Sequence, residues 1–159
     1  MTRKKNCVMV IKKITLLVAL LGIWGLSKAQ TAEKAFVKEN FTFATAQAEK
    51  MLTTLALTKK KGRMPHSMDS SGKLIAGSIY NWTSGFFPGL LWYLGAYNKD
   101  ARLENAALQL TQELEPLKNF TDNHDIGFMM YCSYGNAYRI TQNAAYKDIL
   151  VKSAESLMT

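Results

Sequence analysis

The chain has 159 residues, which suffices for one domain with a hydrophobic core and is too short for two ordinary domains. Its formal net charge of +8 at first suggests a nucleic-acid partner. However, six of the 20 basic residues lie in the first 29 positions, which contain no acid. The remainder of the chain has 14 basic and 12 acidic residues. The remaining balance of +2 provides no basic surface for phosphates, and this excludes nucleic-acid binding.

The first 29 residues have the parts of an export signal peptide. Basic residues extend to Lys13, an apolar run follows over Ile14–Leu26, and Ser27–Ala29 resembles a cleavage site. A membrane anchor is the alternative, but the run has 13 residues where a spanning helix needs about 20. We therefore expect cleavage after Ala29, a periplasmic or secreted protein, and no membrane partner for the mature chain.

The two cysteines cannot pair in the mature chain, because Cys7 leaves with the signal peptide. The remaining Cys132 could be a nucleophile or a small buried hydrophobe. No His and acid are arranged around it in the sequence as thiol catalysis requires. We interpret it as a buried hydrophobe.

Apolar spacing predicts helices from residue 31 onward. A long helix is expected over residues 31–58, followed by a polar loop that contains Pro65 and Gly72 and cannot continue it. Its apolar face consists of Val37, Phe41, Ala44, Ala48, Met51 and Leu55.

Two of the later predicted helices are apolar on nearly every face, and two have a single apolar face. Residues 84–98 and the helix beginning near Ile126 are of the first kind, so we expect them to be buried on all sides. Residues 101–119 and 144–158 are of the second kind, and no strand pattern appears. The single apolar faces comprise Leu103, Ala107, Leu110, Leu114 and Leu117 in one helix and Tyr146, Ile149, Leu150, Ala154 and Leu157 in the other.

This alternation of one-sided and buried helices predicts an all-α fold. A ring of helical hairpins, with inner helices wrapped by outer ones, would produce it, and so would a helical solenoid. The chain stops at Thr159 without a helix stop signal. We therefore expect residues 30–159 to form an incomplete helical domain. Together with the cleaved signal peptide over residues 1–29, this accounts for the whole chain.

The segments that enter the two apolar helices contain the candidate functional residues. Trp82 precedes the first and offers a flat apolar face that suits a sugar ring, although a core Trp is the alternative. His124 and Asp125 precede the second. Asp125 could be a carboxylate that accepts hydrogen bonds or a proton from sugar hydroxyls. Alternatively, Thr121, Asp122 or Asp125 is a plain helix cap. His66 and His124 have no Cys or carboxylate at metal-ligand spacing, so we expect neither a metal nor a cofactor.

The two entry segments together resemble the unsaturated glucuronyl hydrolases, glycoside hydrolase family 88. The resemblance is carried by WTSGFFPGLLW over residues 82–92 and by HDIGF over residues 124–128. Phe87 stands where the family commonly has Trp. The resemblance spans residues 35–159, which would be the first third of a family member.

The resemblance implies a six-hairpin (α/α)6 toroid acting on oligosaccharides that end in a 4,5-unsaturated uronic acid. The family hydrates the vinyl ether of this sugar and thereby releases it. Asp125 would engage the sugar hydroxyls, Trp82 would flank the sugar, and His124 would line the same pocket. The proton-donating Asp would lie beyond Thr159, so we expect the 159-residue chain alone to be inactive. The family gives no role for Pro65 and His66.

Two alternatives remain open at the level of the sequence. One is a related toroid hydrolase for unsaturated rhamnogalacturonyl products, whose motifs match less well. The other is a non-catalytic helical-repeat protein that binds a protein or a glycan.

Overall fold

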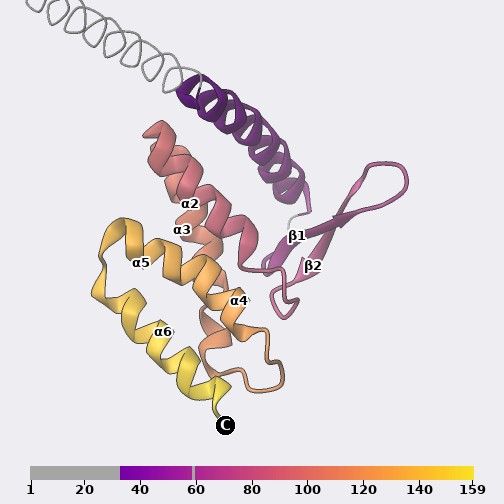
Figure 1. Ribbon diagram of the computed structural model, residues 1–159. Coiled ribbons are helices and arrows are strands. Elements are labelled where there is room, and N and C mark those ends of the chain that lie inside the picture. Colours follow the sequence, from indigo (N-terminus) through magenta and orange to yellow (C-terminus); the bar gives the residue numbers. More distant parts are fainter. Residues whose placement is uncertain (1–32, 59) are drawn as a thin grey trace, which may run out of the picture. The chain divides into compact units, whose positions relative to one another are not determined.

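The computed structural model describes residues 33–58 and 60–159 (Figure 1). The predicted signal peptide lies outside these residues. Within the described ranges, no helix combines the length and the apolar character that crossing a bilayer requires. The chain divides into two units, residues 1–42 and 43–159. The described part of the first unit is helical over residues 33–42, with Asn40 Nδ2 donating to the Phe36 carbonyl at 2.8 Å.

The second unit begins within the same helix, which continues to residue 57. The predicted apolar face is only partly buried there. Ala48 is 1% exposed, and Ala44, Met51 and Leu55 are half-buried. The helix predicted over residues 31–58 is therefore confirmed over the described positions.

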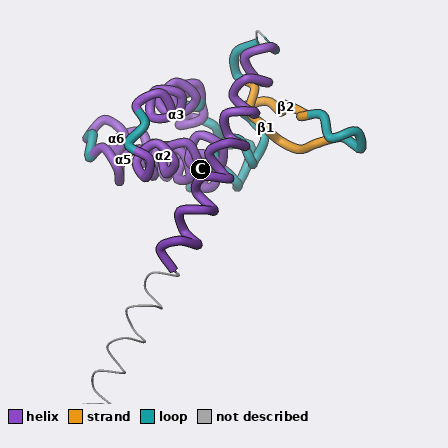
Figure 2. Tube along the Cα trace, turned by 90° about the horizontal axis from the view of Figure 1, so that it is seen from above, coloured by secondary structure: helices purple, strands orange, loops and turns teal. Residues whose placement is uncertain are grey.

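A β-hairpin follows where the sequence indicated only a loop. Strand β1 (Arg63–Met68) pairs antiparallel with β2 (Leu74–Ser78), and no third strand joins them in the described part of the chain (Figure 2). The turn between them contains Gly72 at φ +79°. The expectation of no strand was wrong, because Pro65 and the short polar runs leave no alternating pattern to recognise.

Helices α2 (Phe86–Asn98) and α3 (Ala101–Glu113) form the first helical hairpin. Lys99 ends α2 in the left-handed region at φ +54°. Asp100 then caps α3, because its carboxylate accepts a hydrogen bond from the Arg102 N–H at 2.9 Å. The connection is therefore only two residues long.

The helix predicted over residues 101–119 is divided in two. Helix α3 ends at Glu113, and a 3₁₀ turn, η1 (Glu115–Asn119), follows. Pro116 explains the change, because proline cannot donate the backbone hydrogen bond that would continue an α-helix.

The second apolar helix is built from three consecutive pieces. These are α4 (Ile126–Met130), the π turn η2 (Tyr131–Gly135) and α5 (Asn136–Thr141). The segment ends where Gln142 adopts φ +57°. The sequence placed its beginning correctly at Ile126.

Helix α6 (Ala144–Leu157) begins with Asn143, whose Oδ1 accepts a hydrogen bond from the Ala145 N–H at 3.1 Å. Only part of the apolar face predicted for this helix is buried. Ser156 is buried and donates from Oγ to the Lys118 carbonyl at 2.7 Å. Of the predicted positions, Tyr146, Ile149 and Leu150 are half-buried, whereas Ala154 and Leu157 are exposed.

Neither apolar helix is buried on all sides in the described structure. Along α2, one stripe of side chains keeps 39% to 44% of its surface exposed. Phe128 and Tyr131 are 53% and 69% exposed. Complete burial is therefore not reached within the described residues, because an apolar sequence shows which faces can be buried and these residues do not supply a neighbour for each face. The stripe on α2 consists of Phe86, Leu90, Tyr93 and Tyr97.

The core of the second unit joins the hairpin to the later helices. Met64 of β1 is 1% exposed and packs in the same cluster as Ile126 and Met129 of α4. This core therefore holds β1 and the start of α4 together. Its buried members are Met64, Leu114, Leu117, Ile126, Met129, Met130 and Tyr134.

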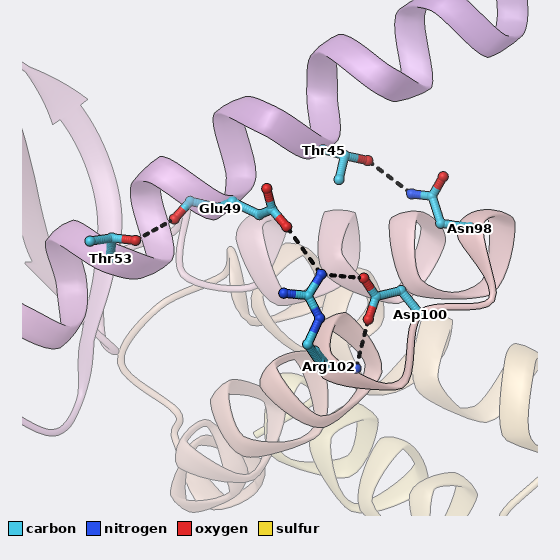
Figure 3. Close-up of polar contacts among 6 residues, drawn as sticks. All are labelled: Thr45, Glu49, Thr53, Asn98, Asp100 and Arg102. Carbon is cyan, nitrogen blue, oxygen red and sulfur yellow. Dashed lines mark hydrogen bonds and ion pairs between the residues drawn. The ribbon is translucent and has the colours of Figure 1, made fainter.

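Polar contacts tie residues 43–57 of the long helix to the corner between α2 and α3 (Figure 3). Asn98 Nδ2 donates to Thr45 Oγ1 at 2.9 Å. Arg102 lies 3.4 Å from Glu49 and 2.8 Å from Asp100. The α2–α3 corner therefore has hydrogen-bonded and charged contacts to the helix before it.

Candidate active site

The two motif segments meet because the start of α2 lies directly on the backbone of α4 and η2. A Cβ atom at Gly85 would overlap the carbonyl oxygen of Met129, and one at Gly89 would overlap that of Cys132. These glycines stand four residues apart and therefore share one helix face. The glycines of the WTSGFFPG segment thus permit a backbone approach that a larger residue would prevent.

Three exposed aromatic side chains gather where these segments meet. The ring of Trp82 lies 5.6 Å from that of Phe86 and 6.4 Å from that of Phe128, and the last two are 6.2 Å apart. All three pairs are edge-to-face, a preferred geometry for aromatic rings. Trp82 is 47% exposed, so the alternative of a core Trp is wrong. We call Trp82, Phe86 and Phe128 the aromatic cluster.

Asp125 is connected to the aromatic cluster because it lies in the same helical turn as Phe128. The Phe128 N–H donates to the Asp125 carbonyl at 2.9 Å, so the two residues share the first turn of α4. The Asp125 side chain is 26% exposed. The structure therefore brings Trp82 and Asp125 to one region, although 43 residues separate them in the sequence (125 − 82).

The Asp125 carboxylate does not cap α4 with a hydrogen bond. Instead, the side chain of Asn123 accepts a hydrogen bond from the Asp125 N–H at 2.8 Å. Asp125 therefore occupies the N-cap position of α4, but its side chain does not make the capping hydrogen bond that a plain cap would make. Because the Asp125 carboxylate makes no bond to α4, its oxygens can accept hydrogen bonds from elsewhere.

His124 is almost completely outside the packed structure. Its side chain is 92% exposed, and its Nε2 atom lies 3.5 Å from Asp125 Oδ1. The contact is too long for a good hydrogen bond. The pocket-lining role of His124 stays a prediction.

Sequence reasoning missed Phe86, Phe128 and Asn123. The two phenylalanines were interpreted as buried helix residues, and only the tertiary structure shows them exposed beside Trp82. Asn123 did have a local signal, because Asn two residues before a backbone donor commonly forms this kind of turn. Asn143 makes the same turn before α6.

Cys132 is half-buried and carries a free thiol. Burial raises the pKa of this thiol above its ordinary value, which lowers the fraction of reactive thiolate. This supports a packing role for Cys132. Across residues 33–58 and 60–159, no three His, Cys, Asp or Glu side chains are grouped as a metal site would require.

Comparison with known proteins identifies relatives of this arrangement. No family model matches the chain. An unsaturated glucuronyl hydrolase from Formosa agariphila is 29% identical over 154 residues, which are 93% of this chain and 38% of that protein. A solved unsaturated glucuronyl hydrolase specific for heparin is 38% identical with a TM-score of 0.63, over 74% of this chain and 32% of its own. The chain resembles the unsaturated glucuronyl hydrolases.

The similarity to the unsaturated glucuronyl hydrolases covers fold as well as sequence. An Asp-to-Asn variant of one such enzyme, solved with dGlcA-Glc-Rha-Glc, has a TM-score of 0.61 and 26% identity over 72% of this chain and 31% of its own. The solved neighbours are (α/α)6 toroids, of which this chain covers a fragment. The chain spans about a third of the length of the relatives it matches. The resemblance to these enzymes and the toroid fold class, both predicted from the two motifs, are thus confirmed.

Proposed function

We propose that this chain forms part of a glycoside hydrolase that removes a 4,5-unsaturated glucuronyl residue from the non-reducing end of an oligosaccharide. Its substrates are the products that polysaccharide lyases leave, of the glycosaminoglycan type. The related enzymes support this class, since one is specific for heparin and another was solved with a dGlcA oligosaccharide.

The observation that carries the proposal is the position of Asp125. Its carboxylate makes no hydrogen bond to the helix it precedes, and it shares the first turn of α4 with Phe128 of the aromatic cluster. A carboxylate accepts sugar hydroxyls, and aromatic rings cover the apolar carbon-bound hydrogens of a sugar. Both features are needed to hold a uronic-acid ring in one orientation.

The reaction is a hydration of the vinyl ether. A carboxylic acid protonates C4, and the electron pair of the C4–C5 double bond forms the new C–H bond, which leaves oxocarbenium character at C5. Water adds at C5 and gives up a proton to the same carboxylate, so one group serves as acid and then as base. The resulting hemiketal opens and releases the neighbouring sugar. Asp125 holds the sugar hydroxyls during this sequence, and the proton donor is a second Asp beyond Thr159.

The first experiment replaces Asp125 in the protein that carries this chain. Asp125→Asn keeps the size of the side chain but removes a charged acceptor, so turnover should fall by about 100-fold or more while the fold is retained. Turnover is measured from the loss of ultraviolet absorbance as the conjugated alkene of the unsaturated disaccharide disappears. Circular dichroism checks the fold.

The matched control is Asp122→Asn. Asp122 lies in the same segment, is exposed, and contacts the Thr121 hydroxyl at 3.4 Å. Its replacement should leave turnover within about twofold of the parent, since surface changes of this kind have small effects. Near-parental rates in Asp125→Asn, or equal losses in both variants, would falsify the role of Asp125.

A further inference from the structure

A histidine of the β-hairpin contacts the segment that carries Trp82. His66 of β1 places its Nδ1 atom 3.1 Å from Thr83 Oγ1, across 17 residues of sequence. Thr83 directly follows Trp82. The contact therefore joins the hairpin to the entry of α2 beside the aromatic cluster.

The direction of this hydrogen bond follows from Asn81. The Asn81 Oδ1 atom lies 3.1 Å from the Thr83 backbone nitrogen and 2.9 Å from Thr83 Oγ1. A backbone N–H can only donate, so the atom of Asn81 that faces Thr83 must be its oxygen. The orientation of the Asn81 amide is thereby fixed.

The Thr83 hydroxyl must then donate to Asn81. If its hydrogen pointed to His66 instead, two acceptor oxygens would face each other at 2.9 Å with no hydrogen between them. With that hydrogen committed to Asn81, Thr83 Oγ1 can offer His66 only a lone pair. His66 Nδ1 therefore carries a hydrogen and donates it, and in the neutral ring Nε2 is the nitrogen with the lone pair.

The backbone around His66 is closely packed, although the histidine itself is exposed. A Cβ atom at Gly77 of β2 would lie 3.2 Å from the His66 Cβ, so the hairpin backbone passes closely beneath the histidine. Two residues earlier in β1, Met64 is 1% exposed in the core that also contains Ile126 of α4. The strand that carries His66 is thus anchored to the same core as the helix that follows Asp125.

We propose that His66 is a positioning residue for Trp82: its Nδ1–H bond to Thr83 fixes the 81–83 turn and, through it, the indole of the aromatic cluster. This inference rests on the proposed function only in taking Trp82 as a contact of the sugar. The structure assigns His66 no contact with the reacting atoms.

The first test reads the bond itself in the free protein. Long-range ¹H–¹⁵N spectra should show the neutral His66 ring with hydrogen on Nδ1, and the opposite tautomer would overturn the proposal. The indole N–H signal of Trp82 should move in His66→Ala and return in His66→Asn, because an Asn amide nitrogen can replace the Nδ1 donor. An unmoved indole signal in His66→Ala contradicts the proposal even if the protein proves to have another substrate.

The second test separates positioning from folding by kinetics on the unsaturated disaccharide. His66→Ala and Thr83→Val should each raise KM about tenfold with kcat within about twofold, because they weaken ground-state binding alone. The double variant should be no worse than Thr83→Val alone, because that change already breaks the bond to His66 together with the one from the Thr83 hydroxyl to Asn81. His66→Asn should recover the parental KM, and Ser67→Ala on the same strand should leave it unchanged.

The outcomes distinguish the two proposals. If Trp82→Ala raises KM and His66→Ala does not, the positioning role is wrong. If Trp82→Ala leaves KM unchanged, the sugar contact proposed for Trp82 fails, and the indole signal still decides whether His66 positions it. If His66→Asn fails to recover KM and the indole signal, the Nδ1 donor is not what His66 supplies.

Discussion

At the scale of single residues, the site depends on which side chain satisfies which backbone donor. Asn123 accepts the Asp125 N–H at 2.8 Å, and Asn143 accepts the Ala145 N–H at 3.1 Å in the same geometry. The second turn simply begins a helix. The first also fixes the backbone of Asp125, whose carboxylate we propose to bind the sugar. The two asparagines therefore make the same bond with different consequences.

This difference can be measured with a matched pair of variants. Asn123→Ala and Asn143→Ala should each lower the free energy of unfolding by about 1 kcal/mol, the usual cost of losing such a cap. Only Asn123→Ala should also lower kcat/KM, since the backbone that carries the Asp125 carboxylate then loses the bond that fixes it. Denaturant titration and the alkene assay give the two quantities. If Asn143→Ala reduced kcat/KM equally, a general loss of stability would explain both.

At the scale of elements, two glycines decide how closely the helices approach. Gly85 and Gly89 lie against the carbonyl groups of Met129 and Cys132, with no room for a methyl group. This contact sets the separation of α2 from α4 and η2, and it brings Trp82 within 6.4 Å of Phe128. The arrangement of the aromatic cluster is thus a consequence of helix packing and not of its own ring contacts, which are individually weak.

Substituting one glycine in each motif tests whether helix packing depends on this close backbone approach. Gly85→Ala should lower the free energy of unfolding by about 1–3 kcal/mol, since the added methyl group forces the backbones apart. Gly127 of α4 has no atom within 4 Å of an added Cβ, so Gly127→Ala should be neutral or stabilise by up to about 1 kcal/mol. Thermal unfolding of both variants measures the changes. An equal effect of the two substitutions would show that backbone approach is not what Gly85 provides.

At the scale of the whole molecule, charged contacts join the long helix to the α2–α3 corner. Hydrogen bonds from the side chain and backbone of Arg102 hold the pKa of Asp100 below its ordinary value. The Arg102 guanidinium lies 2.8 Å from the Asp100 carboxylate and 3.4 Å from that of Glu49 (Figure 3). Because the folded pKa of Asp100 is depressed, its contribution to stability is complete above the unfolded pKa and is lost as the pH falls through the folded value.

The corresponding prediction concerns acid stability. At neutral pH, Asp100→Asn should be less stable than the parent protein. The difference should shrink as the pH falls below the unfolded pKa of an Asp, about 4, and through the lower folded pKa of Asp100. Unfolding free energies of both proteins from pH 7 to pH 2 measure it. Asp69, whose pKa is lowered by Ser71, is present in both proteins and cancels in the comparison. A difference independent of pH would mean that the charge of Asp100 contributes nothing.

The sequence by itself determined the helices, their order and the two motifs. Apolar spacing and caps act within a few residues, so the starts near Ile126 and Ala144 and the helix over residues 33–57 follow from local sequence. The motifs around Trp82 and Asp125 are local as well. They sufficed to indicate the resemblance to the unsaturated glucuronyl hydrolases, which are the proteins that the chain proves similar to.

Only the tertiary structure decided which apolar faces are covered by other elements and which hydrogen-bond donors are paired with which acceptors. The β1–β2 pairing, the exposure of Phe86 and Phe128, and the bond from His66 to Thr83 each join parts of the chain that local spacing cannot relate. The side chain of Asn123 accepts from the Asp125 N–H, whereas the Asp125 side chain makes no capping bond to α4. Periodicity shows which surfaces can be buried, whereas the partner of each surface depends on the packing of the whole chain.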